Sequence, residues 1–169
     1  MSQWLQTIDS YCEEETFLQH EIFEQGCYEP LRPIEVQEPL IIDVGANVGI
    51  FALWALQKWS KARLICLEPL PPVVKKLHEN LSEAKIFSLK AFGAFEVQDR
   101  TMILPLAMGF VEETAEFFYF PDAPGESTRN VMEAAEQRDR LLRAAEEAKL
   151  PVHEAQRWSI SYVTSLDGS

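Results

Sequence analysis

Short apolar segments alternate with amphipathic ones through the first half of the chain. An almost wholly apolar run at 40–44 is followed by an apolar helix-type segment at about 48–58. A second apolar run at 63–67 is followed by three prolines. These prolines begin a segment that is predicted to be a helix ending near residue 81. Apolar strands that alternate with helices are typical of a parallel sheet covered by helices. The pattern therefore predicts a β-α-β-α unit with parallel strands.

The next part of the chain offers two candidates for the third central strand. Residues 85–90 and 102–106 both read as short strands, and only one of them is needed. We favour 102–106, although Pro105 is unfavourable in a central strand because it cannot donate a hydrogen bond to a neighbour.

The C-terminal part is predicted to contain two more strands and a long helix. An outer strand is expected at 114–120, a loop at 121–129 and a last strand at 159–163. The highly charged segment at 130–150 reads as a helix with a narrow apolar stripe. It is interpreted either as a lid or partner-binding helix or as a solvated amphipathic helix.

Composition limits the domain organisation and the partners. We expect a helical N-terminal lead-in over residues 1–38, followed by one α/β domain over 39–169. The net charge of −12 argues against a nucleic-acid partner, which would require clustered lysine and arginine. The three cysteines have no metal-binding spacing, so no metal is expected. Without an apolar run of membrane-spanning length or a leader segment, no membrane partner and a cytoplasmic location are expected.

The chemistry is concentrated where the two predicted strands end. Asp43 is followed by Gly45 and Gly49 at the start of the helix, and Glu68 ends the second strand. An acid at the second strand tip can accept hydrogen bonds from ribose hydroxyls. An acid at the first tip suits a cationic ligand better than a pyrophosphate. Asn47 replaces a glycine of the dinucleotide-binding motif, which disfavours a nicotinamide oxidoreductase.

Less specific interpretations remain open for the same residues. The glycine segment is also compatible with an ordinary strand-turn-helix connection, and Glu68 with a solvated acid at a strand end. His20 is a candidate proton acceptor. We favour the alternative that it is a helix-surface or packing residue.

The segment Asp43–Gly49 resembles motif I of the class I S-adenosylmethionine-dependent methyltransferases, and more narrowly that of the FkbM-type family. Further segments in the same order are similar to later parts of this family. The similarity covers residues 17–129, and it extends to a counterpart of a later strand at 163–167. These segments are Phe17–Phe23, Leu67–Pro69, Leu106–Gly109, Ala115–Pro121 and Ser127–Thr128.

The resemblance implies a Rossmann-like class I methyltransferase sheet that binds S-adenosylmethionine. It implies methyl transfer to a hydroxyl of a small molecule or of a lipid- or sugar-type substrate, and it assigns no catalytic base. Glu68 would hold the ribose, and Ala107 and Met108 would lie near the adenine at the tip of the third strand. The implied cofactor-binding residues are Asp43, Gly45, Ala46, Asn47, Gly49, Glu68, Pro69, Ala107 and Met108.

The chain departs from the family pattern in two places. Residues 87–100 read as an insertion, and no counterpart of the fourth, Asp-ended strand follows. We therefore expect a truncated sheet, incomplete on its C-terminal side. The alternative function is a non-catalytic, methyltransferase-like binding module. An incomplete sheet leaves an exposed edge strand, through which the chain is expected to form a homo-oligomer.

Overall fold

The computed structural model describes residues 13–91, 100–121, 124–148 and 155–163. The chain forms two compact units, Met1–Pro105 and Leu106–Ser169, and each is described by itself. No helix in these ranges is both long enough and apolar enough to span a membrane.

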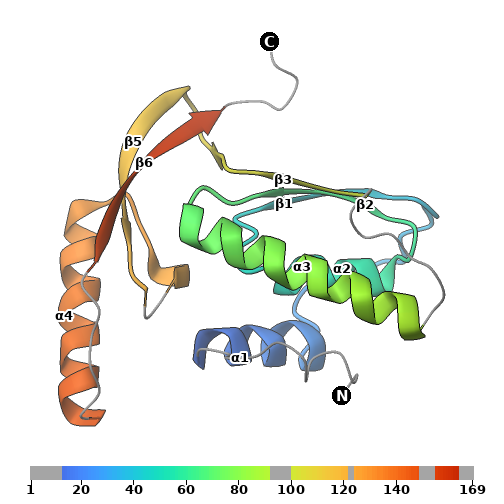
Figure 1. Cartoon of the computed structure of the whole chain (residues 1–169), viewed down its shortest axis with the longest axis horizontal. Coiled ribbons are helices and arrows are strands. Elements are labelled where there is room, and N and C mark those ends of the chain that lie inside the picture. The colour runs from blue at the N-terminus through green and yellow to red at the C-terminus, as the bar shows by residue number, and fades with distance from the viewer. Residues whose placement is uncertain (1–12, 92–99, 122–123, 149–154, 164–169) are drawn as a thin grey trace. The chain divides into compact units, whose positions relative to one another are not determined.

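Unit 1 is built on a parallel sheet of three strands in the order β1-β2-β3 (Figure 1). The α-helices α2 and α3 connect these strands and lie on the same side of the sheet. This is the Rossmann-like α/β arrangement predicted from the sequence. The elements are β1 (Leu40–Val44), α2 (Ile50–Lys58), β2 (Arg63–Leu67), α3 (Pro71–Ala91) and β3 (Thr101–Leu104).

The register of the strands determines which face of the sheet each side chain occupies. Asp43 pairs with Cys66, so both side chains belong to the same face as the fully buried Leu64 two residues earlier. Alternate residues of β1 belong to the other face, where Ile42 is half exposed. Asp43 thus points to the buried face of the sheet.

A further helical layer covers α2. The short helices α1 (Glu13–Gln19) and η2 (His20–Glu24) contact α2, and Tyr28 stacks edge-on against Phe51 with ring centroids 4.9 Å apart. Six of the nine residues of α2 are buried, as expected for a helix whose first seven residues are all apolar. The described part of the N-terminal lead-in therefore packs within unit 1.

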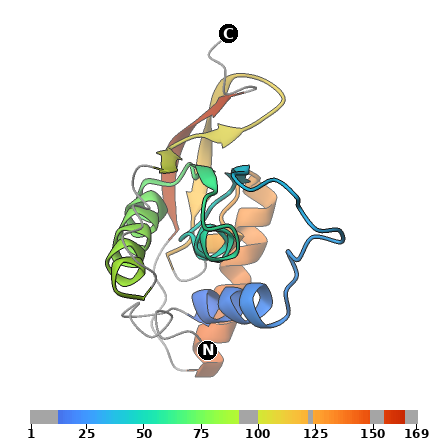
Figure 2. The same cartoon turned by 90° about the vertical axis from the view of Figure 1, so that its right-hand side faces the viewer.

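Unit 2 is a small mixed sheet with one long helix. Its strand order is β4-β6-β5, in which β4 (Ala107–Met108) is parallel to β6 (Gln156–Val163). The strand β5 (Glu113–Tyr119) runs antiparallel to β6 along its length, as the two paired ribbons in Figure 2 show. A 3-10 turn, η4 (Pro124–Glu126), and the helix α4 (Val131–Ala148) connect them.

The start of α4 follows from its capping residue. The Oδ1 atom of Asn130 accepts hydrogen bonds from the backbone N–H groups of Met132 (3.0 Å) and Glu133 (3.4 Å). Asparagine is among the most favourable residues at this position because it satisfies N–H groups that the helix leaves free. The predicted helix at 130–150 is thus confirmed over its described part.

The prediction of a strand at 85–90 is wrong, because these residues belong to α3. No glycine or proline interrupts the chain between Pro72 and Lys90, so the helix continues beyond the predicted end near residue 81. A short apolar run is compatible with either structure, and its length alone does not decide between them.

The third strand is present, but at the edge of the sheet rather than at its centre. It pairs with β2 over Thr101–Leu104 and ends before Pro105, which explains how the proline is tolerated. The first part of the expected insertion at 87–100 completes α3, and its residues 92–99 lie outside the described ranges. Along the chain, the boundary between the two compact units falls after Pro105, and the sequence does not predict it.

Candidate functional site

The loop between β1 and α2 is held by its own backbone hydrogen bonds. The N–H groups of Gly45 and Ala46 both donate to the carbonyl oxygen of Leu67, each at 2.9 Å. The N–H group of Gly49 donates to the carbonyl oxygen of Ala46, also at 2.9 Å. The loop is thereby attached to the end of β2 and closes tightly before the helix.

Three positions of this loop have a left-handed backbone. The φ angles are 78° at Gly45, 48° at Asn47 and 89° at Gly49. Glycine adopts such angles without a steric penalty, and asparagine tolerates them better than most residues. This explains why asparagine can occupy the middle position. It also explains why α2 begins at Ile50 and not at the predicted residue 48.

The two glycines meet different surroundings. A Cβ atom at Gly49 would lie 2.6 Å from Cδ1 of Leu77, which is fully buried on α3. A Cβ atom at Gly45 would have no neighbour within 4 Å. Gly49 thus allows α3 to pack against the loop, whereas Gly45 leaves open space at the strand tip.

Glu68 joins the loop to the segment after β2. Its Oε2 atom accepts a hydrogen bond from the N–H group of Asn47, and its Oε1 atom accepts one from Leu70, both at 3.0 Å. The side chain is only 6% exposed. Burial raises the pKa of Glu68, while the two backbone hydrogen bonds oppose that shift by stabilising the charged form. Each carboxylate oxygen retains capacity for a further donor.

Asp43 is a second acid at the same strand ends. Burial, and next the charge of Glu68, raise the pKa of Asp43 to about 6. Its Oδ2 atom is inaccessible to solvent and has no hydrogen-bond partner among the described residues. The pKa of the neighbouring Cys66 thiol is raised to about 12, first by burial and then by Asp43, so the thiol stays protonated. The site therefore combines a buried acid, Glu68, and a partly buried acid, Asp43, at neighbouring strand tips.

The structure brings together seven of the nine predicted cofactor-binding residues: Asp43, Gly45, Ala46, Asn47, Gly49, Glu68 and Pro69. The other two, Ala107 and Met108, do not form the tip of the third strand as expected. They form β4 in the sheet of unit 2, because the chain leaves the first sheet at Pro105. Their role beside a cofactor stays a prediction.

Sequence reasoning missed Asn80, the polar residue of α3 that contacts the loop. Its Nδ2 atom donates a 2.8 Å hydrogen bond to the carbonyl oxygen of Val48. The side chain is 2% exposed and lies among the buried residues Val73, Leu77 and Leu81 of the same helix. An asparagine within an apolar stripe at helical spacing was the available signal.

The remaining candidates contribute little to this site. His20 is exposed on η2, where its Nδ1 atom lies 2.8 Å from Oε2 of Glu24. This is the helix-surface position favoured from the sequence. No group of three or more metal-ligating side chains occurs in the described parts of the chain.

The chain is similar to curated proteins that are named as methyltransferases. It is 31% identical over 116 residues to methyltransferase sdnD of Sordaria araneosa, which covers 68% of this chain and 39% of that protein. It is 23% identical over 149 residues to methyltransferase 1 of Beauveria bassiana, covering 85% of this chain and 53% of the relative. No family model matches the chain.

One solved structure also matches part of the chain, at lower identity. The FkbM methyltransferase of Methylobacillus flagellatus shares 15% sequence identity, with a TM-score of 0.41 over 69% of this chain and 27% of that one. The chain is an α/β protein related to methyltransferases, as its motifs predict. It spans about two fifths to one half of the length of the two curated methyltransferases.

The two glycines offer a matched test of the loop. Gly45→Ala is expected to destabilise the protein by roughly 1–2 kcal/mol, because alanine is strained in the left-handed region. Gly49→Ala should cost about 1–3 kcal/mol more, because its methyl group overlaps Leu77 in a packed core. Urea unfolding of both variants measures this difference. Equal losses of stability would contradict the packing of α3 against Gly49.

The raised pKa of Asp43 predicts a dependence of stability on pH. An acid whose pKa is higher in the folded state favours folding when protonated, and this contribution is lost as the pH rises from about 4 to about 6. Asp43→Asn should therefore raise the melting temperature more at pH 7.5 than at pH 5. Asp139→Asn, at an exposed position of α4, is the control and should give no such difference. The same shift at both pH values for Asp43→Asn would contradict the burial of this acid.

Proposed function

We propose that the chain binds S-adenosylmethionine at the β1–α2 loop and forms the cofactor-binding part of an FkbM-type methyltransferase. The reaction we propose is methylation of a hydroxyl group on a small molecule. The observation that carries this proposal is the hydrogen bond from the Asn47 N–H group to the buried Glu68 carboxylate. It unites the glycine loop and the acid of the second strand into one site. The relationship to methyltransferases supports it.

The donors and acceptors of the site fit this cofactor. Glu68 is already oriented by two backbone N–H groups, and its oxygens can also accept bonds from the two ribose hydroxyls. The buried Oδ2 atom of Asp43 lacks a hydrogen-bond donor in the described structure and suits a cationic group. The open space at Gly45 suits close approach of a ligand to the backbone. When bound, S-adenosylmethionine supplies a methyl group activated by the sulfonium.

The role of the chain's own residues in this proposal is to bind and orient. The loop's hydrogen bonds to Leu67, Ala46 and Glu68 hold its backbone in one conformation. A site that is formed in advance requires little reorganisation when the ligand binds. With an activated methyl donor, much of the rate enhancement can come from holding donor and acceptor in line.

Titration calorimetry tests this proposal directly. S-adenosylmethionine and S-adenosylhomocysteine are expected to bind with measurable heat at sub-millimolar concentration. Glu68→Ala should weaken binding by up to about 3 kcal/mol, because hydrogen bonds to a charged group are lost. The control is Glu79→Ala, at an exposed glutamate of α3, which should leave the affinity unchanged. Absence of heat with the unmodified chain would refute the proposed cofactor.

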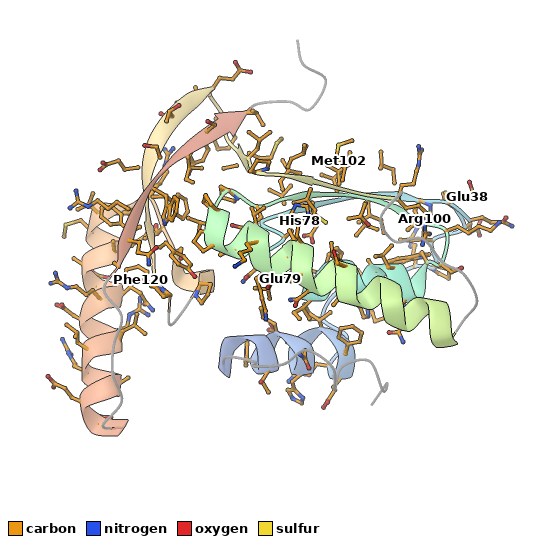
Figure 3. The ribbon with its side chains drawn as sticks, in the orientation of Figure 1. Glu38, His78, Glu79, Arg100, Met102 and Phe120 are labelled. Carbon is orange, nitrogen blue, oxygen red and sulfur yellow. The ribbon has the colours of Figure 1, made fainter. Side chains whose placement is uncertain are left out.

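A second candidate function, that of a binding module, is favoured by an exposed apolar face of the sheet. Side chains on this face are half exposed or more: Leu40 (54%), Ile42 (50%), Val44 (58%) and Met102 (56%). Figure 3 shows Met102 on the side of the sheet away from α3. Among the described residues, β1 pairs only with β2 and has a free outer edge. We propose a second copy of the chain as the partner, because such an edge can pair with itself about a twofold axis.

Sedimentation equilibrium tests the binding-module proposal. The unmodified chain is expected to reach the mass of two chains as its concentration rises. Ile42→Glu should keep it monomeric, because a charge at the interface would be desolvated. Leu142→Glu, at an exposed leucine on α4, is the matched control and should not change the mass. A monomer at every concentration would contradict self-association.

A further inference from the structure

Asn80 provides a hydrogen bond from α3 to the candidate cofactor loop. Its Nδ2 atom lies 2.8 Å from the carbonyl oxygen of Val48, although the two residues are 32 positions apart. Both residues are buried, with 2% of Asn80 and 4% of Val48 exposed. The bond thus connects two separate elements within the protein core.

The carbonyl of Val48 needs a partner because of the way α2 begins. Gly49 is the capping residue, and its carbonyl oxygen accepts the first bond of the helix, from the N–H group of Leu53 at 2.9 Å. The preceding carbonyl, that of Val48, lies outside this ladder of hydrogen bonds. A buried carbonyl without a donor is unfavourable, since it has lost its contact with water. The Asn80 amide supplies that donor without introducing a charge.

Val48 lies between the two residues through which the loop meets its surroundings. On one side, Asn47 donates its N–H group to Glu68. On the other side, Gly49 packs against Leu77, one turn before Asn80 on α3. The Val48 carbonyl shares a peptide group with the Gly49 N–H, which donates to the Ala46 carbonyl, and that carbonyl shares a peptide group with the Asn47 N–H. A bond at the Val48 carbonyl therefore restricts both of these peptide groups. The orientation of the Asn47 N–H group, and with it that of the Glu68 carboxylate, depends on this restriction.

We propose that Asn80 is a positioning residue for the cofactor loop: through Val48 it holds Asn47 and Glu68 in the geometry that binds the ligand. The inference rests on the proposed function, because the ligand is the cofactor proposed for that site. Asn80 itself acts through the loop. A purely structural role would lower stability and leave ligand affinity and loop motion unaffected.

The test compares Asn80→Asp with Leu64→Val. The first variant keeps the size of the side chain but places a carboxylate oxygen against the Val48 carbonyl. The second removes one methylene from a buried position at the start of β2, at the far end of that strand from Glu68. At alkaline pH we expect Asn80→Asp to weaken S-adenosylhomocysteine binding about tenfold in calorimetry. Leu64→Val should lower the melting temperature and leave the affinity unchanged.

Lowering the pH provides a specific rescue. A protonated carboxyl group at position 80 can donate a hydrogen bond to the Val48 carbonyl, as the amide does. The affinity of Asn80→Asp, relative to the unmodified chain at the same pH, should therefore recover as the pH falls. Equal affinity of this variant and the unmodified chain at alkaline pH, where the carboxyl group is ionised, would overturn the inference.

Amide hydrogen exchange keeps the inference testable apart from the proposed function. If the unmodified chain binds neither S-adenosylmethionine nor S-adenosylhomocysteine, the proposed function is wrong, and exchange decides the positioning role alone. Asn80→Asp should speed exchange at Asn47 and Gly49 more than Leu64→Val does. Equal exchange in the two variants would overturn the inference. Where Asn80→Asp does not fold, Asn80→Ala serves in the same comparison, since it also removes the donor.

Discussion

The candidate site depends on the hydrogen bond between the Asn47 N–H group and the Glu68 carboxylate. This bond crosses from the turn after the first strand to the end of the second, two segments that are adjacent only because their strands are parallel neighbours. It holds a buried acid in a fixed orientation close to a second acid, Asp43. Two neighbouring carboxylates shielded from water are unfavourable together unless donors or cations compensate them. The same unfavourable charge is what makes the site suitable for a cationic ligand.

Much of unit 1 could be predicted because its strands and turns have strong local causes. The bounds of β1 and β2 match the sequence prediction: Pro39 and Gly45 border the first apolar run, and Pro69 follows the second. The loop residues are recognisable for a related reason. Left-handed backbone positions favour glycine at 45 and 49 and tolerate asparagine at 47. The spacing of these three residues in the sequence therefore predicts the turn. The cofactor contacts of these residues remain predictions.

Other features depend on tertiary context and could not be predicted. The strand expected at 85–90 is helical, because a short apolar run fits both periodicities and only the continuation of α3 decides between them. Ala107 and Met108 do not lie at the tip of β3 as the sequence predicts, because the chain changes sheets after Pro105. Asn80 was missed because its partner, the Val48 carbonyl, belongs to a distant segment. Such long-range pairings have no local signature.

The most direct test of a cofactor site at the β1–α2 loop is a ¹⁵N–¹H correlation spectrum recorded during titration with S-adenosylhomocysteine. The amide signals of Gly45, Asn47 and Gly49, together with that of Leu70, are expected to shift in a saturable manner with one common affinity. Signals from α4, which belongs to unit 2, report whether any shift is general. If the loop signals stay in place while the ligand is in excess, the central claim is contradicted.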